Sequence, residues 1–498
     1  MRAKMSGAAP REFFQSIAAV NAQATPRSLA FLIDGAPLSW QELHARAGSA
    51  ATSLDEMGAS RVGVQVQDPR LFIYCLFGAI MASKTIVPLP PDSEVAFLDA
   101  VATDCDLDLL VVDRRESTCA HCRTVEASEL LEGRFDRQRF SKPKATVDRD
   151  FMISYSSGST GVPKGIVHTE RSFDARARIH QAQYRLNDCS NTLITAPLYT
   201  GRAIAPLLST SFAGGTSIVI SKYETAAVLD ALNTEHVSSF GLLPYQFRLL
   251  IDHSEFDIER ARACDFIMCG GTSLDQTLRT ELFSLFPSNF VEVYGSTECD
   301  VIAACPREMP LDKRGSVGIP PDGVYLLTLN DNDNRLMDGG EIAVCSPANM
   351  KGYVKHGQQN DSWCVTDFGR TYVRTGDVGH IDEDGYLWLT GRKKDIIKVG
   401  GFTVFPSDVE SVLRKHALVA DAAVVGKPHP VLGEVPFGFI VLRDHRTAAD
   451  SQRMALEIRV WANSRLQSKQ MLHGVVAIDA LPGSGGGKIS KPKLRALI

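Results

Sequence analysis

Extended and helical sequence patterns alternate over the first 300 residues, and this alternation restricts the fold more than any other feature. The stretch Arg61–Val66 predicts a strand, Leu71–Ala82 predicts a helix, and Thr85–Leu89 predicts a second strand. Strands that alternate with helices form largely parallel sheets whose faces the helices cover. The first 300 residues therefore predict an α/β fold built from layered subdomains.

The pattern changes after Arg314, where short strands are separated by turns rich in Gly, Asp and Asn. This region favours a β-rich subdomain. Beyond Lys398, strands and helices alternate again over about 100 residues, a length that can fold independently. Because a domain commonly has about 100–200 residues, a chain of 498 allows two to four domains. We expect a large domain over residues 1–393 and a small α+β domain over 394–498.

Charge, hydropathy and cysteine usage exclude several classes of protein. The chain has 53 Lys and Arg against 58 Asp and Glu, without a long basic run, which argues against nucleic-acid binding. No apolar stretch reaches the roughly 18 residues that a membrane-spanning helix needs, and the start turns polar before a signal-peptide core. The eleven cysteines are scattered and odd in number, as for reduced thiols. We therefore expect a cytoplasmic protein without a membrane span.

The segment Tyr155-Ser-Ser-Gly-Ser-Thr-Gly-Val-Pro-Lys-Gly165 concentrates glycines, hydroxyl side chains and one lysine directly after an apolar stretch. Glycines let a backbone approach a ligand closely, and the amides, hydroxyls and Lys164 can then hold phosphate oxygens. The kinase-like phosphate loop, G-x-x-x-x-G-K-[ST], does not fit, because Lys164 is followed by Gly165. A flexible surface loop is the alternative interpretation.

Four further motifs follow in order: Tyr294-Gly-Ser-Thr-Glu298, Tyr372-Val-Arg-Thr-Gly-Asp377, Gly391-Arg-Lys-Lys-Asp-Ile-Ile-Lys-Val-Gly-Gly401 and Pro482-Gly-Ser-Gly-Gly-Gly-Lys-Ile-Ser-Lys491. Alone, each has an ordinary structural explanation, such as a turn, a solvated run of charges or a frayed terminus. Together with the loop, they resemble the signatures of the adenylate-forming superfamily, which includes acyl- and aryl-CoA ligases, peptide-synthetase adenylation domains and luciferases. The resemblance covers about residues 13 to 495 and is greatest to stand-alone acyl- or aryl-CoA ligases.

The resemblance implies an ATP site and a role for each matching residue. Thr297 would contact a phosphate, Glu298 would help to hold Mg²⁺, and Asp377 would bind the ribose hydroxyls. Oxygen ligands suit this hard cation. Arg392 would reach the ribose or the phosphates. The complete expected ATP-binding set is Ser156, Ser157, Gly158, Ser159, Thr160, Gly161, Lys164, Gly270, Gly271, Tyr294, Gly295, Thr297, Asp377 and Arg392.

By the same resemblance, the last 105 or so residues form a mobile domain. Lys488, which a run of glycines precedes, would act with Thr160 and the metal-binding glutamate in forming the adenylate. Lys394 stands at the family's hinge position, and the domain would rotate about it to bring Gly400 and Gly401 beside the tunnel for the thiol. One site cannot hold both arrangements at once, which is the physical reason for a hinge.

The acid pocket implied by the resemblance draws on three segments of the chain. Its expected lining is Tyr199, Thr200, Arg202, Leu243, Tyr245 and Gly295. Amino-acid-activating members carry an Asp just after the position of Tyr199, and many CoA ligases carry a gating His; neither is present here, which argues against an α-amino acid substrate. Tyr245 is bulky enough to limit the size of the acid. Arg202 either faces the pocket, where it could pair with a second acidic group, or faces solvent or a neighbouring carboxylate.

These expectations combine into an ATP-dependent ligase for a small carboxylic acid. The carboxylate attacks the α-phosphorus of Mg·ATP, pyrophosphate leaves, and the acyl-adenylate then passes to a thiol. Coenzyme A is the first choice of thiol, and the phosphopantetheine arm of an acyl carrier protein is the alternative. A non-catalytic nucleotide-binding protein is an alternative of another class, against which the retained Lys488, Glu298 and Asp377 argue. A kinase would release ADP instead of AMP. The sequence indicates neither the particular acid nor the oligomeric state.

Overall fold

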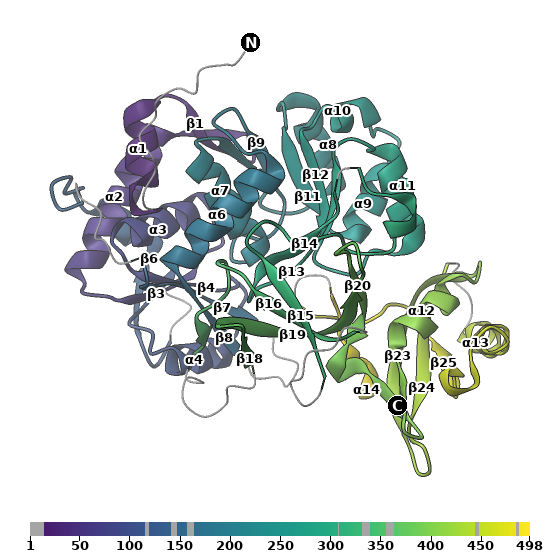
Figure 1. Cartoon of the computed structure of the whole chain (residues 1–498). Helices are drawn as coiled ribbons and strands as arrows, with labels where there is room; N and C mark the ends of the chain where they lie inside the picture. The colour runs from purple at the N-terminus through teal and green to yellow at the C-terminus, as the bar shows by residue number, and fades with distance from the viewer. Residues whose placement is uncertain are drawn as a thin grey trace.

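The computed structural model describes residues 14–114, 119–140, 147–156, 164–306, 308–330, 339–354, 363–443, 448–484 and 488–498. Two mixed sheets, one antiparallel sheet and a separate C-terminal sheet carry most of the strands. Figure 1 shows the C-terminal elements grouped to one side of a larger N-terminal part.

The first large sheet has the strand order β14-β13-β12-β11-β9-β10-β1-β2. Its strands are β1 (Leu29–Ile33), β2 (Ala36–Ser39), β9 (Asn191–Ile194), β10 (Thr216–Val219), β11 (Ser239–Leu242), β12 (Phe266–Gly270), β13 (Phe290–Ser296) and β14 (Asp300–Ala304). All pairs from β13 to β1 are parallel, and only the two edge strands β14 and β2 pair antiparallel. The carboxyl ends of four adjacent strands, β13, β12, β11 and β9, therefore meet along one edge.

The second large sheet has the order β17-β8-β7-β4-β3-β5-β6. Its strands are β3 (Arg61–Gln65), β4 (Thr85–Pro88), β5 (Leu109–Val112), β6 (Arg123–Glu126), β7 (Asp150–Ser156), β8 (Lys164–Thr169) and β17 (Gly352–Tyr353). The strands β7 and β8 pair antiparallel, so that Ser156 and Lys164 face each other across the ladder at the two ends of the glycine-rich segment. The two residues that flank the expected phosphate loop therefore lie side by side at one end of this sheet.

Helices lie between the two sheets and on their outer faces (Figure 1). Those between the sheets include α1 (Ile17–Ala24), α2 (Trp40–Glu56), α3 (Pro69–Met81), α6 (Glu170–Tyr184) and α7 (Gly201–Ala213), whose apolar side chains form one core with β1 and β3. The others are α4 (Val95–Asp104), α5 (Ala127–Glu132), α8 (Thr225–Thr234), α9 (Pro244–Ile251), α10 (Ile258–Arg262) and α11 (Gln276–Leu285).

Local sequence explains where the helices begin. Asp68 accepts hydrogen bonds from the first amides of α3, at Arg70 and Leu71, and Pro69 occupies the first helical position, where no amide is needed. Ser39 caps α2 in the same way by accepting from the amide of Glu42. The predicted helix and strands between residues 61 and 89 are confirmed, with ends shifted by two residues or fewer.

The predicted β-rich subdomain is a five-stranded antiparallel sheet. It contains β15 (Tyr325–Leu329), β16 (Gly340–Cys345), β18 (Cys364–Asp367), β19 (Arg370–Ile381) and β20 (Leu387–Arg392). A single turn of 3-10 helix, Lys393–Asp395, follows β20 and leads into the C-terminal sheet.

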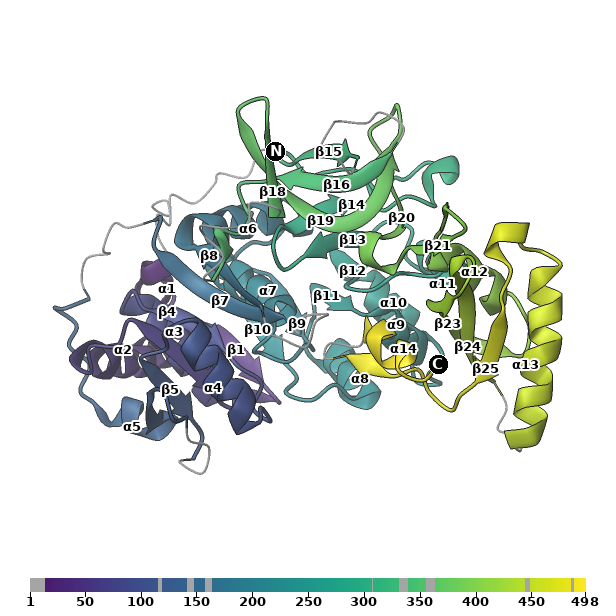
Figure 2. The same cartoon turned by 90° about the horizontal axis from the view of Figure 1, so that it is seen from below.

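The C-terminal sheet has the order β22-β21-β24-β23, with β25 paired to β24, and it has a hydrophobic core of its own. Its elements are β21 (Ile397–Val399), β22 (Phe402–Val404), α12 (Pro406–Arg414), β23 (Val419–His429), β24 (Gly433–Leu442), α13 (Ala448–Asn463) and β25 (Gly474–Ala477), followed by the short β26 (Gly483–Ser484), β27 (Lys488–Ile489) and α14 (Lys491–Arg495). Figure 2 shows α13 on the outer side of this sheet. The predicted fold class, α/β with a small C-terminal α+β part, is confirmed.

Candidate active site

The expected binding residues gather at the carboxyl edge of the first large sheet. Gly270 ends β12, Leu243 follows β11, and Thr297 follows β13. Arg202 follows β9, in the first turn of α7. In open α/β sheets, ligands bind in the crevice outside the carboxyl ends of the strands. The sheet order therefore makes neighbours of residues that are up to about 100 positions apart in sequence.

Asp377 is the centre of the first polar cluster. The Tyr294 hydroxyl donates to Asp377 Oδ2 at 2.6 Å, and Arg392 Nε lies 2.9 Å from Asp377 Oδ1. Asp377 and Arg392 are partners across the β19–β20 ladder, which explains their contact. Burial raises the pKa of Tyr294, and the Asp377 charge raises it further, so the phenol remains a donor. Arg392 is 47% exposed, and each carboxylate oxygen has a second lone pair, so the cluster can accept the hydroxyls of a ribose.

Glu298 and Lys164 form a second cluster with Tyr353. The Tyr353 hydroxyl donates to Glu298 Oε1 at 3.1 Å, and Lys164 Nζ lies 5.6 Å from the centroid of the Tyr353 ring. Burial raises the pKa of Tyr353, and Glu298 adds to the shift, which keeps this phenol protonated. The first and second motifs thus meet around one aromatic ring. Sequence reasoning missed Tyr353, because no motif marks it.

The donor set at this cluster fits Mg²⁺. Glu298 is half-buried and offers carboxylate oxygens, while the neighbouring Thr297 is exposed and offers a hydroxyl. Hard divalent cations take oxygen ligands of these kinds, together with waters and phosphate oxygens. The site residues therefore agree with the cation that the sequence led us to expect, and the roles themselves remain predictions.

Parts of the expected machinery lie outside the described residues. These are Ser157, Gly158, Ser159, Thr160 and Gly161. The structure places Ser156 at the end of β7, and it pairs the backbone of Lys488 with that of Ser484 between β27 and β26. The Lys488 side chain also lies outside what the structure describes.

Two glycines of the set meet structural requirements that another residue would not. Gly271 has φ +87°, in the left-handed region that side chains disfavour. Gly295 is crowded, because a β-carbon there would overlap the carbonyl oxygen of Asp300 on β14. The glycines therefore fix the shape of the strand ends next to the expected nucleotide.

A buried arginine on α6 supports the turn that carries Thr297 and Glu298. Arg176 is 4% exposed, and its Nη2 donates to the carbonyl oxygens of Thr297 at 3.0 Å and Ala348 at 3.2 Å. The same nitrogen lies 3.0 Å from His168 Nδ1, on β8. Burial, together with the Arg176 charge, lowers the pKa of His168 well below its ordinary value, so this histidine is neutral and accepts. Sequence analysis did not identify Arg176.

A second buried contact from α6, made by His180, holds Asp300, the residue that follows this turn. His180 Nε2 lies 3.0 Å from Asp300 Oδ2, and His180 Nδ1 lies 3.0 Å from Ser209 Oγ. Ser209 donates its own hydrogen to the carbonyl oxygen of Ala205 at 2.7 Å, so His180 lies between Asp300 and a serine that is held to its own helix. Burial alone would raise the pKa of Asp300, but His180 and Arg176 together hold it well below its ordinary value.

The order Asp300–His180–Ser209 matches that of a nucleophile triad, yet its chemistry is different. Ser209 is only 1% exposed, and its hydrogen bonds to its own helix, so no substrate can reach it. Asp300 has φ +61° at the start of β14, a left-handed conformation that Asp tolerates better than most residues. The cluster therefore anchors the strained turn after Glu298.

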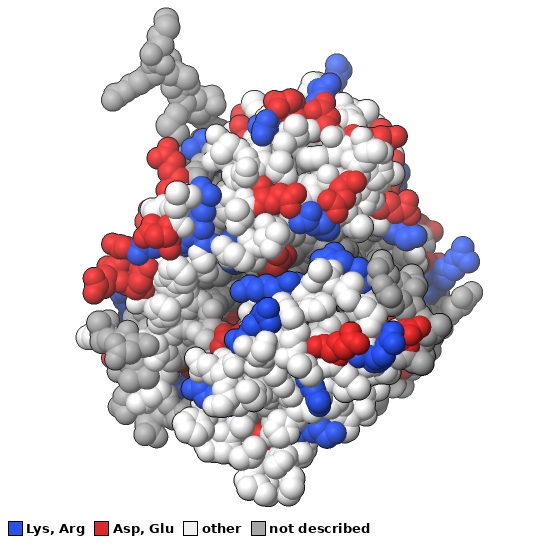
Figure 3. All heavy atoms as spheres, turned by 90° about the vertical axis from the view of Figure 1, so that its right-hand side faces the viewer, with Lys and Arg blue, Asp and Glu red and all other residues white. Residues whose placement is uncertain are grey.

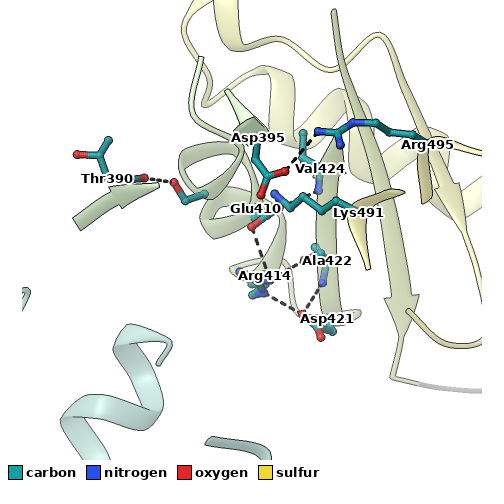
Figure 4. A network of polar contacts seen from close by, with 10 residues as sticks. Thr390, Asp395, Glu410, Arg414, Asp421, Ala422, Val424, Lys491 and Arg495 are labelled. Carbon is teal, nitrogen blue, oxygen red and sulfur yellow. Dashed lines mark hydrogen bonds and ion pairs between the residues drawn. The ribbon is translucent and has the colours of Figure 1, made fainter. Parts of the chain in front are cut away.

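The expected hinge is linked to the C-terminal helix α14. Figure 4 shows Arg495 reaching Asp395, with Nη2 3.4 Å from Oδ1, and Lys491 Nζ lying 3.0 Å from Glu410 Oε1. Burial lowers the pKa of Lys394, which lies between Lys393 and Asp395, and the nearby Arg392 lowers it further. Gly400 and Gly401 form the turn between β21 and β22, with φ +56° and +87°.

Basic side chains gather between the two parts of the molecule. Figure 3 shows Lys and Arg along the hollow between the N-terminal elements, above, and the C-terminal elements, below. Figure 3 also shows Asp and Glu at the upper rim of the hollow, so the basic side chains are interspersed with acidic ones. The basic side chains there can attract an anionic ligand such as a nucleoside triphosphate.

Comparison with protein families identifies the class of protein. The model of the AMP-binding enzyme family matches residues 18–354, and the model of the AMP-binding enzyme C-terminal domain matches residues 408–488. The first match alone covers about two thirds of the chain. The chain belongs to the AMP-binding enzyme family, and its predicted place among adenylate-forming enzymes is confirmed.

Several curated proteins are similar over most of the chain. A feruloyl-CoA synthase from Amycolatopsis sp is 29% identical over 490 residues, which are 95% of this chain and 96% of that protein. A medium/long-chain-fatty-acid–CoA ligase, FadD8, from Mycobacterium tuberculosis is 28% identical, over 85% of this chain and 74% of its own length. A 2-succinylbenzoate–CoA ligase from Bacillus velezensis is 25% identical, over 96% of both.

Solved structures agree on the fold. ATP-bound MatB from Rhodopseudomonas palustris superposes with a TM-score of 0.85 at 23% sequence identity, over 96% of this chain and 98% of that one. None of the helices in the described ranges is long and apolar enough to cross a membrane.

Proposed function

We propose that the protein is an AMP-forming ligase that joins a small carboxylic acid to coenzyme A. The observation that carries the proposal is the Tyr294–Asp377–Arg392 cluster beside the turn that bears Thr297 and Glu298. These are the groups needed to hold a ribose, a phosphate chain and a cation within one crevice. The relatives described above are named as ligases of CoA with fatty, feruloyl and succinylbenzoyl acids, which supports the same reaction class.

The first half-reaction needs positioning more than acid–base chemistry. A carboxylic acid is ionised at neutral pH and can attack the α-phosphorus of ATP without a protein base. Lys164 and Lys488 would bind phosphate oxygens, while Asp377 and Arg392 would hold the ribose and so fix the α-phosphorus relative to the acid. Thr297 would contact a phosphate, and Glu298 would help to hold Mg²⁺, which supplies neutralisation of phosphate charge. Pyrophosphate leaves, and the acid becomes an acyl-adenylate.

In the second half-reaction, a thiol attacks the acyl carbon and AMP leaves, giving a thioester. We assign this step to a rotation of residues 394–498 about Lys394, which withdraws Lys488 and brings Gly400 and Gly401 toward the adenylate. The separate core of the C-terminal sheet supports movement as a unit. The hinge and the domain boundary are part of the proposal.

Coenzyme A is our choice of thiol, because the feruloyl-CoA synthase and the 2-succinylbenzoate–CoA ligase, which match nearly the whole chain, are named as CoA ligases. One relative of 25% identity, ScoC from Streptomyces coeruleorubidus, is named as a fatty acid–[acyl-carrier-protein] ligase, so the assay includes a carrier protein. We place the reaction in the cytoplasm, which the free thiols of the buried cysteines support.

The test is product analysis with a panel of aryl, aliphatic and dicarboxylic acids. The purified protein, ATP, Mg²⁺ and an acid should release pyrophosphate and, with CoA present, form AMP and an acyl-CoA that mass spectrometry identifies. Formation of ADP would refute the reaction class. Pyrophosphate exchange without any thioester to CoA, but with transfer to a phosphopantetheinylated carrier protein, would refute the choice of acceptor. Absence of exchange with every acid would indicate a non-catalytic protein.

A further inference from the structure

Arg202 stands out among the expected pocket residues as a charged side chain without an ion-pair partner among the described residues. In the described part of the chain, no carboxylate lies within ion-pair distance of its guanidinium group. Other arginines around the same sheet are paired: Arg279 makes two contacts of 2.7 Å with Glu292, and Arg248 reaches Glu281 at 2.7 Å. The interpretation in which Arg202 serves a neighbouring carboxylate therefore has no support.

Arg202 is exposed, and its position at the start of a helix does not favour a cation. It is the second residue of α7, and the amides at the start of a helix carry partial positive charge, which repels a cation. The surrounding protein lowers the pKa of Arg202 by partly desolvating the guanidinium group, and Tyr245 opposes this shift. An anion bound at this place would be stabilised by the arginine and by the helix together.

The Arg202 side chain points across the edge of the sheet toward the expected nucleotide. A β-carbon built on Gly271 would lie 3.5 Å from Arg202 Cδ and 3.6 Å from Arg202 Nη1, and 3.0 Å from Leu243 Cδ2. The side chain therefore starts after β9, passes the end of β11 and reaches the end of β12. The next strand, β13, carries Thr297, and adjacent strands lie about 4.8 Å apart.

The surroundings of the guanidinium group combine apolar and polar surface. Leu243 is 3% exposed, and Tyr245, whose hydroxyl influences the charge of Arg202, is 51% exposed. The Tyr245 ring lies 6.5 Å from that of Tyr223, in an edge-to-face arrangement. Such a surface suits a short apolar spacer that ends in a charged group.

We propose that Arg202 binds a second anionic group on the acid, so that the preferred substrates are compact dicarboxylic acids. This inference rests on the proposed function. One carboxylate would lie next to Thr297 and attack ATP, and the spacer would pack on Leu243. The other carboxylate would accept two parallel hydrogen bonds from the guanidinium group, the geometry for which arginine is best suited.

The experiment measures the kcat/KM of pyrophosphate release for two pairs of acid classes. Dicarboxylic acids of three to eight carbons are compared with monocarboxylic acids of equal length, and phthalate isomers are compared with benzoate. Arg202→Met removes the charge and keeps the stem, and Arg202→Lys keeps the charge without the planar fork. The control is Arg262→Met, which changes an exposed arginine on α10 that pairs with Glu259. We expect wild type to prefer a diacid, and Arg202→Met to lower kcat/KM for it by about 10- to 100-fold while monoacids change little.

Each outcome decides the inference. Partial recovery in Arg202→Lys, and wild-type selectivity in Arg262→Met, would support it. A diacid-to-monoacid ratio that is equal in wild type and Arg202→Met would overturn it, and so would an equal loss for all acids, which would place Arg202 on the reacting carboxylate or a phosphate. Wild-type turnover of monoacids alone would overturn the subsite and leave the proposed function standing. No AMP or pyrophosphate from any acid would overturn the proposed function.

Discussion

Replacing Arg176 by methionine tests whether the buried contacts of α6 position the turn that carries Thr297 and Glu298. The change keeps much of the volume of the side chain and removes a donor that serves the carbonyl oxygens of Thr297 and Ala348 and the ring of His168. A hydrogen bond from a charged donor is worth about 1.5–3 kcal/mol, and leaving buried acceptors unpaired costs about 1–3 kcal/mol each. We expect a loss of about 3–5 kcal/mol in the free energy of unfolding.

The same figures give the expected effect on catalysis. If the hydrogen bond to Thr297 holds the turn in its productive position, losing about 1.5–3 kcal/mol of that restraint lowers the rate of adenylation by about 10- to 100-fold. Because the turn bears the expected ligand of Mg²⁺, the concentration of Mg²⁺ for half-maximal pyrophosphate exchange should rise as well. Arg176 touches neither substrate nor cation, so it acts as a positioning residue.

Arg279→Met is the matched control. Arg279 and Glu292 are 11% and 6% exposed and form a two-contact pair on the same sheet, and neither residue makes a hydrogen bond or ion pair with Thr297 or Glu298 among the described residues. Breaking a buried pair from one side costs about 3–5 kcal/mol, so both variants should lose similar stability. Urea midpoints measure that loss, and exchange rates per folded molecule, titrated with Mg²⁺, measure the positioning effect. Equal rates and equal Mg²⁺ dependence in the two variants would refute the reasoning. If Arg176→Met does not fold, Arg176→Lys replaces it in the same measurements.

Three further predictions concern the mobile part and the buried histidine. Lys488→Ala should abolish adenylate formation but leave thioester formation from a supplied acyl-adenylate, and loss of both steps would contradict the assigned roles. Lys394→Pro should leave pyrophosphate exchange nearly unchanged and block thioester formation, because proline restricts the backbone at the expected hinge; an unaffected thioester step would remove the assignment. The third prediction concerns His168, whose pKa is lowered in the folded protein, whereas in the unfolded chain it binds a proton near its ordinary pKa of about 6.5. Its contribution to stability is therefore complete above about pH 6.5 and is lost as the pH falls toward the folded pKa, by up to about 1.4 kcal/mol per pH unit. His168→Phe should weaken the dependence of the urea midpoint on pH between pH 7.5 and 5.5. The same pH dependence in the variant and in wild type would contradict this account.

Much of the fold followed from local patterns. The strand and helix periods between residues 61 and 89 are local signals, and the structure has a strand or a helix at each. Motif residues such as Asp377 and Glu298 were accessible for the same reason, since each lies within a short ordered signature. Their expected roles remain predictions.

The buried contacts that support the site could not be predicted from the sequence. Arg176 and Thr297 are 121 positions apart, and His180 and Asp300 are 120 apart, so only the pairing of β13 with β14 and the packing of α6 bring them together. Read alone, an arginine and a histidine on α6 look like ordinary polar positions of an amphipathic helix. Tyr353 was missed for the same reason, because β17 pairs with β8 only in the folded chain.

Different strand ends carry the residues expected to bind the acid and those expected to bind ATP and Mg²⁺. This separation affects how such a protein can change its preference among acids. The buried contacts of Arg176 and His180 on α6 reach Thr297, Ala348, His168, Asp300 and Ser209. Arg202 belongs to a different strand end and makes none of them. Exchanging residues after β9 or β11 therefore alters what the enzyme accepts without loosening what performs the chemistry. Substrate range should evolve, and should respond to protein engineering, by substitutions at these two loops while the reaction itself is retained.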